Sequence, residues 1–253
     1  MFSDLYVREI RIDRDKPGVD YAGYPFCLPV LRRLNSLELH GKATFFVGEN
    51  GTGKSTLLEA VAVNLGFNPE GGTRNFRFST ADTHSALHGC LKVTKGVRRM
   101  RDGFFLRAET LYNVATNIDD IQAESGGMYG AYGGKSLHRQ SHGEAFMSVM
   151  THRFGGDSLF LLDEPEAALS PTRQMALLSL IDSLIAKNSQ FLIATHSPIL
   201  LALPGAEIYV LTDEGFVSTP YQETEHYIVT REFLNNPRGM LKHLLDPCRN
   251  GED

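Results

Sequence analysis

One short stretch of the sequence has the residue types needed to hold the phosphates of a nucleotide. Residues 48–55 read Gly-Glu-Asn-Gly-Thr-Gly-Lys-Ser and match the pattern G-x-x-x-x-G-K-[ST]. Glycines let successive backbone N–H groups turn toward a phosphate where side chains would collide. Lys54 would reach the β- and γ-phosphates, and the Ser55 hydroxyl would coordinate Mg²⁺. The expected ATP-binding residues are Gly48, Glu49, Asn50, Gly51, Thr52, Gly53, Lys54, Ser55 and Thr56.

Two adjacent acids are candidates for binding the metal and activating water. Asp163 and Glu164 directly follow the apolar run 159–162. A buried strand here would deliver both carboxylates to the sheet edge where nucleotides bind. Asp163 would hold Mg²⁺, and Glu164 would orient or deprotonate the attacking water as a catalytic residue. The alternative is a strand end with a solvated acidic loop, but adjacent carboxylates beside a triphosphate require a divalent cation.

A histidine and a serine–glycine turn add further polar groups. His196 follows the apolar run 191–194, so its imidazole is placed to hydrogen-bond the γ-phosphate or the attacking water, unless it only caps a helix or packs in the core. Residues 141–144 read Ser-His-Gly-Glu, which predicts a helix start with a capping box between Ser141 and Glu144. The N-terminus of a capped helix that begins with a glycine can also bind an anion. If Ser141 and Gly143 bind nucleotide, the nucleotide would be held by a partner molecule.

Alternating strand and helix patterns position these groups. Short apolar runs precede each motif, and the apolar spacing over 54–65 indicates a helix with a buried face. This alternation predicts an α/β P-loop fold with a mostly parallel sheet flanked by helices and an additional antiparallel β lobe. Further expected elements are a strand at 5–12, helices at 141–154, at 171–187 and after Ser197-Pro198, and a hairpin of 207–211 with 216–218.

We expect one domain over residues 1–253. Its core would comprise 1–65 and 141–220, and a glycine-rich lobe at about 66–140 would be inserted between them. That lobe would contain a hairpin of 91–93 with 104–106. A helical tail would follow at about 221–253.

The order of the motifs resembles that of the ATP-binding-cassette ATPases. The matching segments are the phosphate loop at 48–55, Ser-His-Gly-Glu at 141–144, Leu-Leu-Asp-Glu-Pro at 161–165, Ala-Leu-Ser at 168–170 and Thr-His at 195–196. The resemblance implies Mg²⁺-dependent ATP hydrolysis by a homodimer that sandwiches two ATP molecules head to tail. It also implies that Ser141, Gly143 and Glu144 act on the ATP of the other copy, and that His196 senses the γ-phosphate.

Details of the motifs favour a soluble branch of this family. Gln140 and Ser-His-Gly-Glu replace the Leu-Ser-Gly-Gly-Gln of transporter subunits, and Glu166 stands where those have Thr or Ser. The set is closer to chromosome-maintenance, recombination and overcoming-lysogenization-defect ATPases, and to small AAA-family ATPases of bacteria. Two features depart from that pattern: the long coiled coil is absent, and no glutamine clearly occupies the Mg²⁺-sensing position. Glu109 is the candidate for that position as a metal ligand, with Gln122 as the alternative.

Other residues give weaker indications. Arg74 resembles an arginine that links nucleotide and DNA in chromosome-maintenance proteins, although a solvated arginine is the simpler interpretation. Tyr24 or Phe26 is placed to stack on adenine, unless it is a buried loop aromatic. A basic cluster near the expected hairpin would contact nucleic-acid phosphates or simply keep the hairpin soluble; its members are Lys92, Lys95, Arg98, Arg99, Arg101 and Arg107.

The overall composition bounds the function. A formal net charge of −5 argues against a surface built entirely for nucleic acid. No apolar stretch is long enough to span a membrane, and Cys27, Cys90 and Cys248 show no disulfide or metal spacing, so we expect a cytoplasmic protein without membrane insertion. The expected function is ATP hydrolysis in nucleic-acid maintenance, repair or defence. The alternatives are an ATP-binding subunit that energises a membrane transporter, or a nucleotide-switched module that resets a protein partner.

Overall fold

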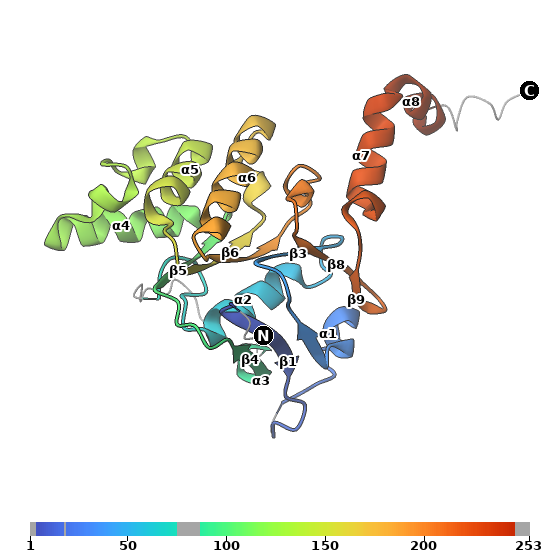
Figure 1. Ribbon diagram of the computed structural model, residues 1–253, viewed down its shortest axis with the longest axis horizontal. Helices are drawn as coiled ribbons and strands as arrows, with labels where there is room; N and C mark the ends of the chain where they lie inside the picture. Colours follow the sequence, from blue (N-terminus) through green and yellow to red (C-terminus); the bar gives the residue numbers. More distant parts are fainter. Residues whose placement is uncertain (1–3, 18, 75–86, 246–253) are drawn as a thin grey trace, which may run out of the picture.

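A six-stranded sheet in the order β5-β6-β7-β3-β8-β9 runs through the middle of the molecule (Figure 1). Each neighbouring pair is parallel except the β8–β9 hairpin. The structure is a computed structural model that describes residues 4–17, 19–74 and 87–245. The strands are β3 (Ala43–Val47), β5 (Asp102–Arg107), β6 (Ser158–Asp163), β7 (Gln190–Ala194), β8 (Glu207–Thr212) and β9 (Gly215–Ser218).

Both faces of this sheet are covered, which explains why its inner strands are continuous apolar runs. Along β6, Phe160 and Leu162 belong to one core, and Leu159 and Leu161 belong to the other. Helices cover the first face (Figure 1): α4 (Leu111–Ser125), α5 (His142–Arg153) and α6 (Pro171–Ala186). Helix α2 (Lys54–Asn64) packs on the opposite face. The predicted parallel sheet with helices on both faces is confirmed.

A second sheet encloses α2 from the other side. It is antiparallel, has the order β2-β1-β4, and packs its apolar side on the core that contains α2. Its strands are β1 (Val7–Ile12), β2 (Ser36–Glu38) and β4 (Leu91–Lys95), with the short helices α1 (Pro29–Arg33) and α3 (Leu87–Cys90) beside them. The expected antiparallel lobe is therefore present.

The expected hairpin of 91–93 with 104–106 is wrong. Strand β4 pairs with β1, whereas β5 pairs with β6 in the other sheet. The reason is burial: Phe104, Phe105 and Leu106 are consecutive and at most 1% exposed, so β5 needs cover on both faces. Only Leu91 of β4 is buried, which suits a strand at the edge of the smaller sheet. The described part of the range 66–140 thus contributes to both sheets and to α4.

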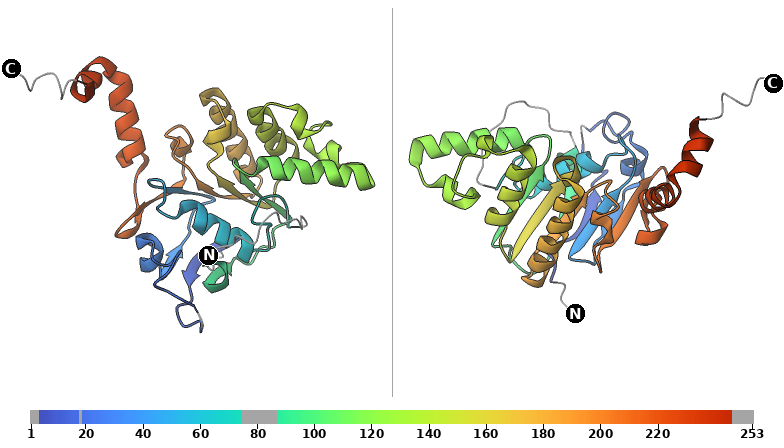
Figure 2. Two further views of the ribbon diagram at one scale, coloured as in Figure 1. Left: turned by 180° about the vertical axis from the view of Figure 1, so that it is seen from behind. Right: turned by 90° about the horizontal axis from the view of Figure 1, so that it is seen from above.

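The C-terminal helices extend away from the sheets. Helices α7 (Glu225–Asn235) and α8 (Pro237–Leu245) project from the side of β8 and β9, as the two views in Figure 2 also show. The helix expected after Ser197-Pro198 is only the 3₁₀ turn η4 (Leu200–Ala202). The other 3₁₀ turns are η1 (Met128–Tyr132), η2 (Leu137–Arg139), η3 (Pro165–Ala168) and η5 (Tyr221–Glu223).

Two further expectations concern thiols and membranes. Cys27 is exposed, Cys90 is buried, and both are free thiols, while Cys248 lies outside the described residues. Within residues 4–17, 19–74 and 87–245, no helix combines the length and apolar character that crossing a bilayer would require.

Candidate functional site

The phosphate loop connects the end of β3 to the start of α2, as its sequence predicts. Gly53 caps the helix with a φ of 101°, a left-handed conformation that disfavours other residues. The first N–H groups of α2 have no partner within the helix because they lie at its start. They are therefore available to stabilise an anion held by the loop. Thr52 Oγ1 donates to the Glu49 carbonyl at 2.9 Å and holds the loop closed.

The side chain of Lys54 is hydrogen-bonded to the backbone of the loop. Its Nζ donates to the carbonyls of Gly48 and Glu49, each at 2.8 Å, and the residue is only 3% exposed. Burial lowers the pKa of the ammonium group below its usual range, and the carboxylates at the end of β6 oppose that effect. A buried cation held only by two carbonyl oxygens is well suited to neutralise incoming phosphates.

The structure brings Ser55 and Asp163 together. Ser55 Oγ donates to Asp163 Oδ1 at 2.9 Å, and Asp163 is 5% exposed. Burial raises the pKa of Asp163 from 3.8 to about 6, although Arg107 and the Ser55 hydroxyl pull the pKa of this carboxyl downward. A hydroxyl and a carboxylate are oxygen ligands of the kind Mg²⁺ takes, usually with phosphate oxygens and waters completing its shell. These two residues therefore fit the ion that the nucleotide chemistry implies.

Arg107 lies beside Asp163, whereas the sequence pattern placed it in the basic cluster near the expected hairpin. It ends β5 directly opposite Asp163 in the parallel register, and its Nε lies 3.3 Å from Asp163 Oδ2. It also forms ion pairs with Glu59, at 2.9 Å, and with Glu109. Its side chain is only 14% exposed. This arginine is held by three carboxylates beside the predicted metal ligands and is not available for a nucleic-acid surface.

Glu109, and not Gln122, lies near the predicted metal site. A cavity of about 430 Å³ is lined by Ser55, Asp163 and Glu164 together with Arg107, Ala108, Glu109, His142 and Ala167. Gln122 lies near the far end of α4, where its Oε1 accepts from the Tyr129 backbone N–H at 3.1 Å. Within residues 4–17, 19–74 and 87–245, no group of three or more His, Cys, Asp or Glu side chains is arranged to hold a metal.

Glu164 and His196 face each other across the ends of β6 and β7. His196 Nε2 lies 3.6 Å from Glu164 Oε1. Glu164 has a φ of 48° and a ψ of 52°, a left-handed conformation that costs a non-glycine residue about 1–3 kcal/mol. Its backbone N–H donates to the Ala194 carbonyl at 2.9 Å, which fixes the turn. The side chain is 41% exposed and thus accessible to water.

Glu166 links the turns that follow β6 and β7, a role that no sequence pattern indicated. Its Oε2 accepts from Thr195 Oγ1 at 2.7 Å, and its Oε1 accepts from the His196 backbone N–H at 2.5 Å. Burial raises the pKa of this carboxyl, while the two hydrogen bonds lower it. The turn after Glu164 and the turn carrying His196 are therefore joined by the half-buried side chain of Glu166.

The serine–glycine turn lies beside the turn that follows β6. Glu144 Oε2 accepts from the Ser141 backbone N–H at 3.0 Å and from Ser141 Oγ at 2.7 Å, so the predicted capping box is confirmed. A Cβ at Gly143 would lie 2.6 Å from the Ala168 carbonyl oxygen and 2.4 Å from Arg173 Nη1. Ser141, Gly143 and Glu144 do not line the cavity at the phosphate loop of their own chain.

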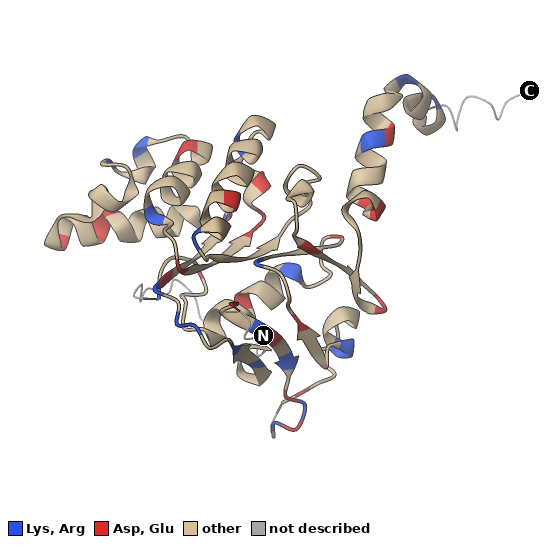
Figure 3. Ribbon diagram, in the orientation of Figure 1, with Lys and Arg blue, Asp and Glu red and all other residues tan. Residues whose placement is uncertain are grey.

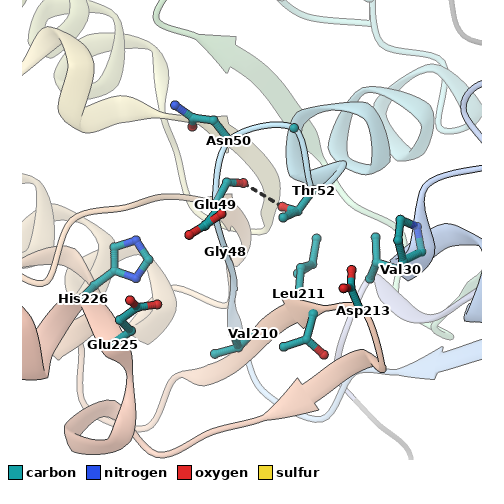
Figure 4. Close-up of a pocket in the computed structure, with 13 residues that line it drawn as sticks. Val30, Gly48, Glu49, Asn50, Thr52, Val210, Leu211, Asp213, Glu225 and His226 are labelled. Carbon is teal, nitrogen blue, oxygen red and sulfur yellow. Dashed lines mark hydrogen bonds between the residues drawn. The ribbon is translucent and has the colours of Figure 1, made fainter.

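That cavity lies between the phosphate loop, β8 and α7 (Figure 4). Its volume is about 440 Å³, and its lining includes Gly48–Thr52 as well as Pro29, Val30, Val210, Leu211, Thr212, Asp213, Glu225 and His226. Figure 4 shows Glu225 and His226 of α7 on the side of Glu49. The first turn of α7 thus forms one wall of this cavity.

The other candidate residues lie in different surroundings. Phe26 is 1% exposed and cannot stack on adenine, whereas Tyr24 is 66% exposed and its hydroxyl is 3.0 Å from Thr56 Oγ1. Arg74 lies beside Gly66, beyond the far end of α2, and α2 is roughly 16 Å long. The structure therefore separates Arg74 from the phosphate loop.

Comparisons with known proteins agree with this arrangement. Two family models match, one described as "AAA domain" over residues 27–125 and one as "AAA domain, putative AbiEii toxin, Type IV TA system" over residues 144–202. The cytochrome c biogenesis ATP-binding export protein CcmA of Rhizobium etli is 31% identical over 176 residues, which cover 63% of this chain and 77% of the relative.

Two more distant similarities extend over more of the chain. The energy-coupling factor transporter ATP-binding protein EcfA2 of Methanospirillum hungatei is 25% identical over 237 residues, 87% of this chain and 58% of that protein. The structure of cbiO1 from Clostridium perfringens, part of the ABC transporter complex cbiONQ, aligns with a TM-score of 0.49 and 16% identity over 96% of this chain and 99% of that one. On the similarity to CcmA, together with the phosphate loop and the acidic strand end, the chain belongs to the ATP-binding-cassette family of P-loop ATPases.

Proposed function

We propose that this protein hydrolyses ATP with Mg²⁺ at a site shared by two copies of the chain, and that this cycle drives a protein partner. The observation that carries the proposal is the cluster at the ends of β3, β6 and β7. There Ser55 meets Asp163 at 2.9 Å and Glu164 faces His196 at 3.6 Å. These are the groups needed to hold a metal, activate water and contact a γ-phosphate.

In this proposal the residues have separate tasks. The loop and Lys54 bind the phosphates, Ser55 and Asp163 would hold Mg²⁺, and Glu109 lines the same cavity as these two residues. Glu164 accepts a proton from the attacking water, and its exposure of 41% leaves room for that water. Mg²⁺ would neutralise charge that develops on the transferred phosphoryl group.

The second half of the site comes from the other copy. Ser141 is exposed and Gly143 is buried at the start of α5, whose first N–H groups favour an anion, and neither residue lines the cavity at the loop of its own chain. A head-to-tail partner would place this turn against the γ-phosphate. ATP would then close the dimer, and hydrolysis would open it.

The dimer is tested with Glu164→Gln, which removes the proton acceptor and keeps the side-chain shape. We expect it to bind ATP, to lose roughly 10²–10⁴-fold in hydrolysis rate, and to shift from the 28.1 kDa monomer to a dimer in ATP and Mg²⁺. Mass is measured by light scattering after gel filtration, with Lys54→Ala as the control that stays monomeric. Hydrolysis at the wild-type rate would remove Glu164 from the proposal.

We favour a membrane transport protein as the partner over nucleic acid. CcmA and EcfA2 are both named as ATP-binding proteins of export or transport, and each aligns with most of this chain. Three members of the expected nucleic-acid cluster face acidic residues: Lys92 pairs with Asp13 at 2.5 Å, Arg98 lies 3.7 Å from Asp4, and Arg107 lies 3.3 Å from Asp163. Figure 3 shows basic and acidic residues interspersed along the chain.

A membrane-protein partner and a nucleic-acid partner predict opposite results in two assays. Immobilised Glu164→Gln in ATP and Mg²⁺ is expected to retain a membrane protein from detergent-solubilised membranes of the source cells, and Lys54→Ala is expected not to. Duplex and single-stranded DNA at low salt are expected to leave the ATPase rate of the wild type unchanged. Salt-sensitive stimulation by DNA without any retained membrane protein would support the nucleic-acid alternative instead.

A further inference from the structure

Two histidines from distant parts of the sequence share a hydrogen bond at the edge of the site. His196 follows β7, and His226 lies in the first turn of α7. His196 Nδ1 and His226 Nε2 are 3.2 Å apart, and the ring centroids are 5.3 Å apart. Both residues also line a cavity of about 510 Å³ with Glu49 and Asn50 of the phosphate loop. His226 is therefore part of the surroundings of the nucleotide, although it lies in the projecting C-terminal helices.

The hydrogen bond restricts where the protons can be. Burial lowers the pKa of both imidazoles, and the nearby Lys54 lowers both further, against the opposing effect of Glu164 on His196 and of Glu225 and Glu166 on His226. Two neutral imidazoles share a hydrogen bond only if one ring nitrogen donates and the other accepts. The pair therefore has two possible arrangements, which differ in the tautomer of His196.

The surroundings of His196 Nε2 select one arrangement. This atom is shielded from solvent, has no hydrogen-bond partner among the residues that the structure describes, and lies 3.6 Å from the Glu164 carboxylate. If His196 donated through Nδ1, the lone pair of Nε2 would face a negative oxygen. If His226 donates instead, Nε2 of His196 carries the proton and points it toward the carboxylate, which is favourable. Electrostatics thus make His226 the donor.

We propose that His226 is a positioning residue that holds His196 as the Nε2–H tautomer, so that a proton donor faces Glu164 and the γ-phosphate. The inference rests on the proposed hydrolysis of ATP for its consequence and on the observed contact between the two histidines for its geometry. Such a second partner orients a histidine and fixes its tautomer in the same way that carboxylates and carbonyls do for ligating histidines. It also links α7 to the site, because a displacement of α7 would remove the donor.

The tautomer is measured directly by nitrogen NMR of the imidazole rings in full-length protein without ATP or metal. The His196 signals are assigned from their loss in His196→Gln. In the wild type we expect Nε2 to carry the proton and Nδ1 to accept a hydrogen bond. In His226→Ala the Glu164 carboxylate alone still favours a proton on Nε2. We therefore expect the Nδ1 signal to lose the shift that accepting a hydrogen bond produces, and both signals to move part of the way toward those of a tautomer mixture. His226→Gln has an amide nitrogen near the position of Nε2 and is expected to restore the wild-type signals.

Kinetics supply the second measurement. His226→Ala is expected to lower kcat by roughly 10–100-fold, the range found when a partner that orients a histidine is removed, with little change in KM for ATP. His226→Gln should recover most of kcat. His243→Ala, an exposed histidine of α8, is the matched control and should change neither NMR signals nor kcat. Circular dichroism and thermal unfolding confirm that each variant is folded.

Each outcome decides the matter. A proton on Nδ1 of His196 in the wild type overturns the proposal, as does a His226→Ala variant with unchanged His196 signals. Changed signals in His226→Ala with rescue by His226→Gln support it. An inactive wild type would refute the proposed function, and the NMR result on the ATP-free protein would still settle the tautomer independently.

Discussion

Replacing Asp163 with Asn is expected to stabilise the metal-free protein and at the same time to weaken its response to ATP with Mg²⁺. Asp163 is 5% exposed, and its pKa rises from 3.8 to about 6 on folding. Between those two pH values the unfolded chain releases a proton that the folded chain still holds. The free energy of unfolding therefore falls as the pH rises through this window, and the whole loss is present at pH 7.

The size of this effect follows from the two pKa values. At about 1.4 kcal/mol per pH unit, the difference between 3.8 and about 6 corresponds to about 3 kcal/mol. Asn has the same shape without the charge, so Asp163→Asn should recover roughly this amount near neutral pH. For a chain of this length that gain raises Tm by roughly 6–12 °C.

Urea denaturation in the presence of a chelator measures the difference. We expect Asp163→Asn to be more stable than the wild type by about 3 kcal/mol near pH 7, and the gain to vanish below about pH 4, where both states of the wild type are protonated. Asp182→Asn on the exposed side of α6 is the control for loss of one negative charge. ATP with Mg²⁺ should raise the Tm of the wild type and leave Asp163→Asn less affected. A variant that is less stable at pH 7, or equally stabilised at low pH, would refute the reasoning.

Three further substitutions test packing and binding. In Gly103→Ala the new Cβ would lie 2.6 Å from the Leu159 carbonyl oxygen, so we expect a loss of about 1–3 kcal/mol in urea denaturation; unchanged stability would contradict the packing. In Gly143→Ala the Cβ would lie 2.6 Å from the Ala168 carbonyl oxygen, so ATP-dependent dimerisation and hydrolysis should fall while the isolated chain still binds ATP; equal activity would argue against a role for this turn. Lys54→Ala should lose binding of a fluorescent ATP analogue, and wild-type affinity would exclude its phosphate contact.

The similarity to known proteins establishes the family of the chain but not the branch of the family to which it belongs. Membership of the ATP-binding-cassette family rests on a relative aligned over most of its length. The finer placement in the chromosome-maintenance branch stays a prediction, because CcmA and EcfA2 both carry transport names. The identity of residue 166 has two possible explanations, one from family branch and one from structure. It distinguishes this chain from transporter subunits in the sequence, and in the structure it ties Thr195 and His196 to the turn after β6.

Features that depend on neighbours in the chain could be predicted from the sequence. The phosphate loop needs a strand, a run of glycines and a helix start in direct succession. All three are local, because φ values and helix caps are set by the residues concerned. The capping box of Ser141 and Glu144 is local for the same reason. The apolar runs that end at Asp163 and His196 indicate buried strands, and parallel strands covered by helices bring their ends to one edge.

Only the tertiary structure decided which distant groups meet. Strands β4 and β5 lie close in the sequence, yet burial on both faces places β5 beside β6, and that register sets Arg107 against Asp163. No pattern in the sequence connects His196 with His226, because α7 reaches the site only after the chain has passed through β8 and β9. Local sequence order therefore predicted a phosphate-binding loop, and long-range packing determined which charged groups and which second histidine lie beside it.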